Sequence, residues 1–204
     1  MSFYRDRVLP YLINLAMRNR RLLPYRERVL SAAEGRVLEI GIGSGLNLPF
    51  YPARVSEIVG LEPAPRLAAM ARRASARSSF PVAFIEGSAE AIPLDHNSFD
   101  TVVTTWTLCS VPDAERALGE MHRVLKPGGR LLFAEHGRAP EAGVRKWQGR
   151  LTPLWKRITG GCHLNRPIDT LIENAGFDIE VLETGYMQGP RPMTFMYEGR
   201  ARPA

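Results

Sequence analysis

The sequence has very little cysteine, with only Cys109 and Cys162 in 204 residues. Two cysteines are too few for a disulfide framework, and these two do not form a C-x-x-C pair. No apolar run approaches the length of a membrane span, and no charged-then-apolar leader precedes a cleavage site. We therefore expect a protein of the reducing cytoplasm.

The chain also lacks the features of a nucleic-acid-binding protein, although its formal net charge is +6. The basic residues are scattered, with short clusters at 18–21 and 72–77, and no aromatic-rich surface accompanies them. A basic balance without a base-reading motif is typical of a solvated surface. We expect no nucleic-acid partner.

Glycine, in contrast, is concentrated in one place. Residues 37–40 form an apolar, strand-like run that leads directly into Gly41, Gly43 and Gly45. Glycines permit a tight turn and close approach of a ligand to the backbone N–H groups. The dinucleotide pattern G-x-G-x-x-G would need a third glycine at 46, where the chain has Leu46, so the turn favours a cofactor without a pyrophosphate. A glycine turn that binds no cofactor is the alternative.

An acidic residue follows the next predicted strand, 57–61, at a useful distance. Glu62 lies 17 residues beyond Gly45 and is followed by Pro63. Nucleotide-binding folds place a ribose-binding carboxylate at about this distance, because two carboxylate oxygens can accept bonds from both ribose hydroxyls. The alternative is a solvated glutamate in a turn.

The rest of the chain alternates between strand and helix patterns. Further strands are expected at 82–85, 99–105 and 130–134, with helices at 66–77 and 112–125. This alternation predicts one α/β domain with a parallel sheet, which ends in an antiparallel hairpin of strands 177–184 and 192–198. No internal repeat or domain boundary is visible.

Residues 1–35 are expected to form a helical lid that is part of the same domain. Apolar residues recur there at helical spacing, at Val8, Leu9, Leu12, Ile13, Ala16 and Met17. A basic amphipathic helix of this kind can also touch a membrane surface. We favour the lid, since an amphipathic helix that covers a core is the commoner case.

Taken together, the motifs resemble those of the class I methyltransferases of the ubiquinone/menaquinone type, over residues 36–135. The matching segments are 39–45, Glu62, 87–90, 99–100 and 125–129. The resemblance implies a Rossmann-like fold with a seven-stranded, mostly parallel sheet, and S-adenosylmethionine as cofactor. One departure is Ser88, where the family usually has aspartate.

The same resemblance implies a set of cofactor-binding residues. The adenine would lie beside Ser88, Ala89 and Glu90, and the methionine end near Glu39 and Thr105. The complete set that we expect is Glu39, Gly41, Gly43, Gly45, Asn47, Glu62, Pro63, Ser88, Ala89, Glu90, Thr105 and Leu108.

A narrower resemblance covers the second half of the chain. Segments 107–111, 134–136 and 155–166 are similar to the family that includes the thiol S-methyltransferases of animals. This resemblance implies that a small, partly apolar thiol is the methyl acceptor. A quinone precursor, a phospholipid head-group amine and a non-catalytic cofactor-binding module remain as alternatives. The oligomeric state is left open.

His136 is the candidate catalytic base, because it follows a strand at the edge where open α/β sheets place their ligands. A histidine that is hydrogen-bonded to a neighbouring loop is the alternative. The candidate substrate-binding residues are Trp106, Cys109, Cys162 and His163. The cysteines and histidines show no short ligand spacing on one element, so the sequence predicts no metal site.

Overall fold

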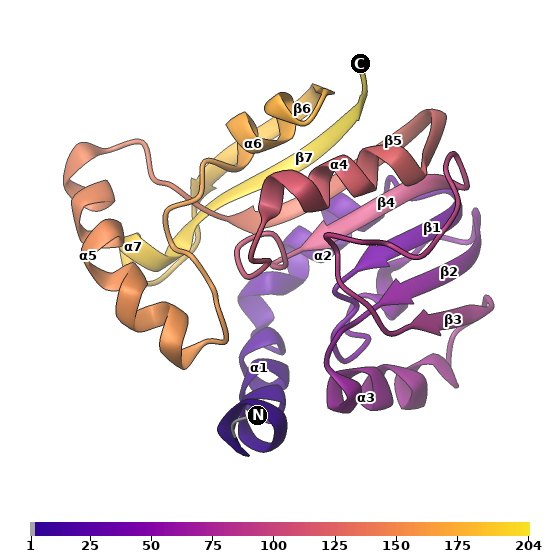
Figure 1. Ribbon diagram of the computed structural model, residues 1–204, viewed down its shortest axis with the longest axis horizontal. Coiled ribbons are helices and arrows are strands. Elements are labelled where there is room, and N and C mark those ends of the chain that lie inside the picture. The colour runs from indigo at the N-terminus through magenta and orange to yellow at the C-terminus, as the bar shows by residue number, and fades with distance from the viewer. Residues whose placement is uncertain (1–2) are drawn as a thin grey trace.

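The computed structural model describes residues 3–204 and contains one seven-stranded sheet (Figure 1). Residues 1–2 of the predicted lid lie outside the described part. The strand order is β3-β2-β1-β4-β5-β7-β6. The strands are β1 (Gly35–Ile40), β2 (Val55–Leu61), β3 (Val82–Ile85), β4 (Phe99–Thr105), β5 (Leu125–His136), β6 (Phe177–Tyr186) and β7 (Phe195–Pro203).

The pairing confirms the predicted fold. β1 pairs in parallel with β2 and β4, β2 with β3, and β4 with β5, whereas β7 is antiparallel to both β5 and β6. β7 lies between two strands, and its first four residues, Phe195 to Glu198, are buried. β7 begins three residues later than the predicted strand at 192, because Arg191–Thr194 form the short helix α7. Pro192 has a fixed φ that suits the first turn of a helix.

The helices differ more from expectation than the strands. They are α1 (Leu9–Met17), α2 (Leu23–Leu30), α3 (Pro65–Ser75), α4 (Ala114–Val124), α5 (Ala142–Ile158), α6 (Ile168–Asn174) and α7, with a π-helical turn (Tyr4–Val8) and 3-10 turns at Arg20–Leu22 and Leu48–Phe50. The sequence did not predict α5 or α6. α5 contains Gly143, Gly149 and Pro153, which are poor helix formers, and its helical pattern is correspondingly weak.

The sheet has a hydrophobic core on each face. Leu38, Val102 and Leu131 belong to the core that includes α4 and α6 residues. Val37 and Val103, their neighbours along β1 and β4, belong to the core that includes α2 and α3 residues. Because alternate residues of a strand point to opposite faces, strands that are apolar throughout are buried on both sides.

The β4–β5 register contains an irregularity at the predicted helix end. Phe99 pairs with Leu125 and Thr101 with Arg130, so residues 126–129 loop out of the ladder. Gly128 in this loop has a φ of +79°, a conformation that favours glycine. β5 therefore begins at Leu125, five residues before the predicted strand.

α1 and α5 lie beyond the carboxyl ends of the parallel strands (Figure 1). The hydroxyl of Tyr4 donates a hydrogen bond to the carbonyl of Ile158 over 2.7 Å and so joins the two segments. Among the described residues, no helix has the length and apolar character needed to cross a membrane.

Candidate active site

A cavity of about 700 Å³ lies at the carboxyl ends of the parallel strands. The loops after β1, β2, β3 and β4 contribute to its wall, as does the end of β5. Residues of α1 and α5 cover it from outside the sheet. This is the position at which open α/β sheets bind ligands.

The glycine turn after β1 forms one wall of this cavity. Gly41 and Gly43 have φ values of +68° and +58° and both line the cavity. A Cβ atom at Gly41 would lie 2.5 Å from the Thr107 hydroxyl oxygen, so no other residue fits there without a shift. Gly45, with a φ of +79°, instead approaches Ala71 and Ala74 of α3. Gly45 therefore allows close packing of the turn on α3 and does not line the cavity.

Glu62 is buried at the end of β2 and holds the glycine turn. Its two carboxylate oxygens accept hydrogen bonds from the N–H groups of Gly43 and Ala64, each over 2.9 Å. Burial raises the pKa of Glu62, while these two hydrogen bonds lower it. Each oxygen retains a second lone pair. The carboxylate can therefore hold the turn and accept hydroxyl hydrogen bonds from a ligand at the same time.

Glu39 lies at the centre of a buried polar network. Its carboxylate accepts hydrogen bonds from Asn47 Nδ2 over 2.7 Å and from the Tyr51 hydroxyl over 3.0 Å. Asn47 also donates to the Thr105 hydroxyl over 3.0 Å, and its oxygen accepts from the Arg26 guanidinium. Burial raises the pKa of Glu39 to about 7, against the lowering effect of these partners. This network connects the ends of β1 and β4 to α2.

The loop after β3 presents a paired hydroxyl and carboxylate. The Ser88 hydroxyl donates to a Glu90 carboxylate oxygen, and the other oxygen of Glu90 accepts from the Asp113 N–H over 3.1 Å. Ser88, Ala89 and Glu90 all line the cavity. Ser88 and Glu90 together thus present oxygen atoms at the cavity wall.

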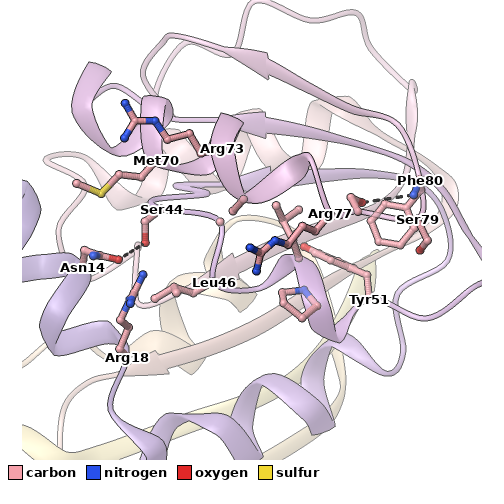
Figure 2. A pocket seen from close by; sticks show the side chains of 15 residues that line it. Asn14, Arg18, Ser44, Leu46, Tyr51, Met70, Arg73, Arg77, Ser79 and Phe80 are labelled. Carbon is pink, nitrogen blue, oxygen red and sulfur yellow. Dashed lines mark hydrogen bonds between the residues drawn. The ribbon is translucent and has the colours of Figure 1, made fainter.

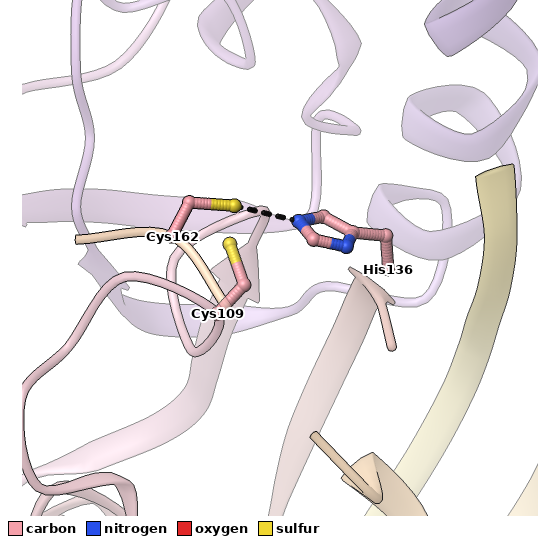
Figure 3. Close-up of side chains that lie close together, drawn as sticks. All are labelled: Cys109, His136 and Cys162. Carbon is pink, nitrogen blue, oxygen red and sulfur yellow. Dashed lines mark hydrogen bonds between the residues drawn. The ribbon is translucent and has the colours of Figure 1, made fainter. Parts of the chain in front are cut away.

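Cys109, His136 and Cys162, which also line the cavity, come together from three separate segments (Figure 3). His136 Nε2 and Cys162 Sγ are 3.0 Å apart, and the three ligand atoms lie within 4.8 Å of one another. His136 is therefore bonded to a neighbouring loop, as the alternative hypothesis expected. The pKa of the Cys162 thiol is raised by its contact with Cys109 and by burial.

The prediction that no metal site is present was based on the absence of short ligand spacing along one element. In the structure, the three residues come from different elements: Cys109 follows β4, His136 ends β5 and Cys162 follows α5. Spacing along one element is therefore no argument against a metal site here. Three donor atoms can meet at the edge of a sheet without any short spacing in the sequence. The donor set is two sulfur atoms and one imidazole nitrogen.

The two cysteine loops are fixed to each other by hydrogen bonds. The His163 N–H donates to the Cys109 carbonyl over 2.7 Å. The Arg166 guanidinium donates to the carbonyls of Leu108 and Val111, the latter over 2.6 Å. Neither Leu108 nor His163 lines the cavity, and Leu108 is fully buried in the core. These two predicted site residues lie beside the site and connect its loops.

Glu135 fixes the loop after β4, which contains Cys109. One of its carboxylate oxygens accepts hydrogen bonds from the N–H groups of Thr107 and Leu108 and from the Thr104 hydroxyl, over 2.9–3.1 Å. The other oxygen is buried and has no hydrogen-bond partner among residues 3–204. Burial raises the pKa of this carboxyl, and its hydrogen bonds lower it. Glu135 thereby positions the segment that leads into Cys109.

Trp106 lines the cavity and has an unusual backbone conformation. Its φ is +51°, an uncommon backbone conformation for a bulky residue, and its N–H donates to the Ala134 carbonyl over 2.9 Å. The Arg26 guanidinium lies 4.8 Å from the centre of the indole ring. A cation in this position is attracted by the aromatic face. The ring is a wall of the cavity, as predicted.

Comparisons with known proteins agree with this geometry. Residues 38–133 match the family model described as a methyltransferase domain. The rat thiol S-methyltransferase TMT1B is 38% identical over 157 residues, which cover 74% of this chain and 63% of that protein. The demethylmenaquinone methyltransferase of Thermus thermophilus is 33% identical, over 67% of this chain and 61% of that protein. The chain thus spans less than two thirds of the length of these relatives.

A solved structure adds a match over almost the whole chain. It is an S-adenosylmethionine-dependent methyltransferase from Thermotoga maritima, described as a possible histamine N-methyltransferase. Its TM-score is 0.67 at 26% identity, over 98% of this chain and 99% of that one. This chain belongs to the class I S-adenosylmethionine-dependent methyltransferases.

Most of the predicted site residues of this methyltransferase line one cavity. Besides those described above, Pro63 and Thr105 also line it. The predicted residues that do not line it are Gly45, Leu108 and His163. The sequence did not predict that Arg26 and Tyr51 belong to the site's hydrogen-bond network, or that Trp155, Leu164 and Met193 line the cavity. In the N-terminal segment, the helical spacing of apolar residues predicted a covering helix at α1. It gave no comparable signal for Arg26 in α2.

The methyltransferase has a second cavity, of about 800 Å³, on the outer side of the glycine turn (Figure 2). Arg18, Arg73 and Arg77 line it. The Ser44 hydroxyl donates to Asn14 Oδ1 over 2.7 Å, and this pair separates the two cavities. Cysteine and histidine are absent from its wall, so the reactive side chains belong to the first cavity.

Proposed function

We propose that this chain transfers the methyl group of S-adenosylmethionine to the sulfur of a small, partly apolar thiol. The observation that supports the proposal most directly is the single cavity that contains both the glycine turn with Glu62 and the group of His136 with two thiols. The similarity to a thiol S-methyltransferase over 74% of the chain supports the same acceptor.

The residues on the glycine-turn side fit the cofactor. Glu62 would accept hydrogen bonds from the ribose hydroxyls, and Ser88, Ala89 and Glu90 would surround the adenine. The buried carboxylate of Glu39, with Asn47 and Thr105, would face the positively charged methionine end. The bound cofactor supplies a methyl group on a positively charged sulfur. A cavity of about 700 Å³ is within the usual range for such ligands.

The apolar part of the cavity lining fits a small apolar acceptor. It includes Leu9, Ile13, Met17, Trp106, Trp155, Leu164 and Met193. The thiolate form of a thiol is the nucleophile, so a nearby group must favour loss of the proton. We assign this role to His136, which lines the cavity at the end of β5. Assistance of this kind typically contributes ~10²–10⁴-fold to the rate.

We infer that residues 1–35 act as a lid on this site. Six residues of α1 line the cavity: Leu9, Pro10, Ile13, Asn14, Ala16 and Met17. Closure by an apolar helix would exclude water and hold donor and acceptor in line, and such positioning can supply up to about 7–11 kcal/mol of a barrier. Two free thiols near the reacting centre favour a reducing compartment such as the cytoplasm.

Two alternatives belong to the same domain type. Methylation of a quinone precursor is favoured by the similarity to the Thermus demethylmenaquinone methyltransferase. Methylation of a phospholipid head-group amine would use the same cofactor side. A third alternative is a module that binds the cofactor without catalysis.

An acceptor screen tests the proposal. S-adenosylhomocysteine release would be measured with simple alkyl and aryl thiols, a phenolic quinone precursor, and vesicles of phosphatidylethanolamine. We expect turnover with thiols and none with the other two classes. Turnover with the phenol or the lipid alone would reject the thiol acceptor and keep the methyltransferase. Cofactor binding by calorimetry without turnover of any acceptor would favour the non-catalytic module.

A further inference from the structure

The donor atoms of Cys109, His136 and Cys162 form a compact group at the wall of the cavity. Their ligand atoms lie within 4.8 Å of one another, and the closest pair is 3.0 Å apart. In a tetrahedral zinc site with Zn–S near 2.3 Å and Zn–N near 2.0 Å, neighbouring sulfur and nitrogen ligand atoms are about 3.5–3.8 Å apart. Shifts of about 1 Å or less would therefore bring all three donors onto one ion.

The chemistry of the donor set favours zinc. Thiolates and imidazole suit soft or borderline metals, and not magnesium or calcium, which take oxygen ligands. Two thiolates would neutralise the 2+ charge in a site where both cysteines are buried. Burial of a charge is costly unless it is paired or coordinated. The neutral sum of one Zn²⁺ and two thiolates therefore favours zinc in this buried site. Two cysteines and one histidine with an open fourth position is a known arrangement for catalytic zinc.

The surrounding protein fixes the three donors before any ion binds. The His163 N–H and the Arg166 guanidinium join the Cys162 loop to the Cys109 loop. Glu135 holds the backbone N–H groups of Thr107 and Leu108, directly before Cys109. His136 is the last residue of β5 and is held by the ladder to β7. Outer contacts of this kind orient metal ligands.

We propose that Cys109, His136 and Cys162 bind one zinc ion, and that the acceptor thiol is its fourth ligand. This inference rests on the proposed function and says how the thiol is activated. On binding, the acceptor thiol would lose its proton to solvent, because a thiol that coordinates zinc is deprotonated outright. Its sulfur then forms the new bond to the methyl carbon, and the electrons of the broken bond stay on the cofactor's sulfur. His136 thus acts through the metal.

Metal content is the first test. Zinc would be measured in the purified full chain by mass spectrometry after growth with added zinc, under reducing conditions. After removal of the metal with a chelator, Zn²⁺ and Co²⁺ alone would be titrated back. We expect one zinc per chain, and with Co²⁺ a thiolate charge-transfer absorption together with the visible bands of a four-coordinate ion.

Variants assign the ligands. Cys162→Ser and His136→Ala should each weaken zinc binding by more than about 100-fold, since even the loss of an outer-sphere partner costs roughly 10–100-fold. His96→Ala is the matched control, because His96 lies exposed in the loop before β4. Unchanged cofactor affinity by calorimetry would show that each variant is folded. Zinc retained by the double variant Cys109→Ser/Cys162→Ser, or no zinc in the wild-type chain, would overturn the proposal.

Activity assays separate this inference from the proposed function. If zinc restores thiol turnover to the chelated enzyme without a change in cofactor affinity, both stand. Equal thiol turnover by the metal-free enzyme would reject the metal's role and keep the thiol acceptor. Stoichiometric, cysteine-dependent zinc without turnover of any thiol would reject the thiol acceptor and keep the metal site.

Discussion

The buried carboxyl group of Glu39 should make the stability of the chain depend on pH near neutrality. Glu39 is 1% exposed, and burial raises its pKa from 4.5 to about 7. The folded-state pKa is above the unfolded value. Between pH 4.5 and about 7, therefore, the folded chain holds a proton that the unfolded chain has lost. Stability attributable to Glu39 is therefore highest below pH 4.5 and falls as the pH rises toward about 7.

The expected size of the effect is measurable. The gap between 4.5 and about 7 corresponds to about 3 kcal/mol, at about 1.4 kcal/mol for each unit of pH. Small domains have a total stability of roughly 5–15 kcal/mol. Replacement by glutamine removes the titrating proton and keeps the shape, because the amide can bond Asn47 through its oxygen and Tyr51 through its nitrogen. The unfolding free energy of Glu39→Gln should therefore decline much less than that of the wild type as the pH rises.

Urea unfolding at a series of pH values between about 5 and 8 measures the effect. The quantity of interest is the difference in unfolding free energy between the wild type and Glu39→Gln, in which the other carboxyl groups cancel. Glu173→Gln is the control, since Glu173 is exposed on α6. The reasoning would be refuted if the unfolding free energies of the wild type and Glu39→Gln changed with pH in parallel.

The same group predicts a pH dependence of cofactor binding. A positively charged methionine end near Glu39 would favour the carboxylate and lower its pKa. Binding should then release a proton near neutral pH, and affinity should rise as the pH increases toward about 7. Calorimetry in buffers of different ionisation enthalpy measures the released proton. An absence of release, or release that persists in Glu39→Gln, would contradict the proposed position of the methionine end.

Three further substitutions test the rest of the site. Glu62→Ala removes the acceptor for the Gly43 and Ala64 N–H groups, each worth about 1–3 kcal/mol when left unpaired, so cofactor affinity by calorimetry should fall about 10-fold or more; unchanged affinity would reject the ribose contact. Gly41→Ala introduces a Cβ 2.5 Å from the Thr107 hydroxyl at a φ of +68°, so thermal stability and cofactor affinity should both fall; Gly119→Ala, inside α4 with open space around it, should leave cofactor affinity unchanged and raise thermal stability slightly. Glu135→Gln places an amide where three donors converge; kcat should fall more than cofactor affinity, and an equal loss of both would indicate general destabilisation instead.

Local patterns in the sequence were sufficient for much of the fold and for the positions of the glycine turn and Glu62 at the cavity wall. The glycine turn and Glu62 depend on residues that are close in the chain, and apolar strand runs show burial on both faces without knowledge of the neighbours. The start of β7 and the whole of α5 were not predictable in this way. In both, proline or glycine weakens the local signal, and packing against distant elements determines the structure.

The group of Cys109, His136 and Cys162 depends on contacts between distant segments. Consecutive members of this group are 27 and 26 residues apart in the sequence, and each follows or ends a different element. Their convergence requires the order of β4, β5 and β7 and the hydrogen bonds of Arg166. Arg26 is similar, because it is 3% exposed yet lies in a helix segment with no local feature that marks it as buried.

Three buried carboxyl groups at the carboxyl edge of the sheet explain how stability and site geometry are connected. Glu39 and Glu135 lie at the ends of β1 and β5, and Glu62 directly follows β2. Burial raises the pKa of all three, so each destabilises the folded chain in its ionised form. Each also accepts hydrogen bonds that fix a loop of the cavity. A neutral replacement would relieve the electrostatic cost and loosen the loop that the carboxylate holds. Stability gained in this way should therefore be accompanied by weaker cofactor binding or slower turnover.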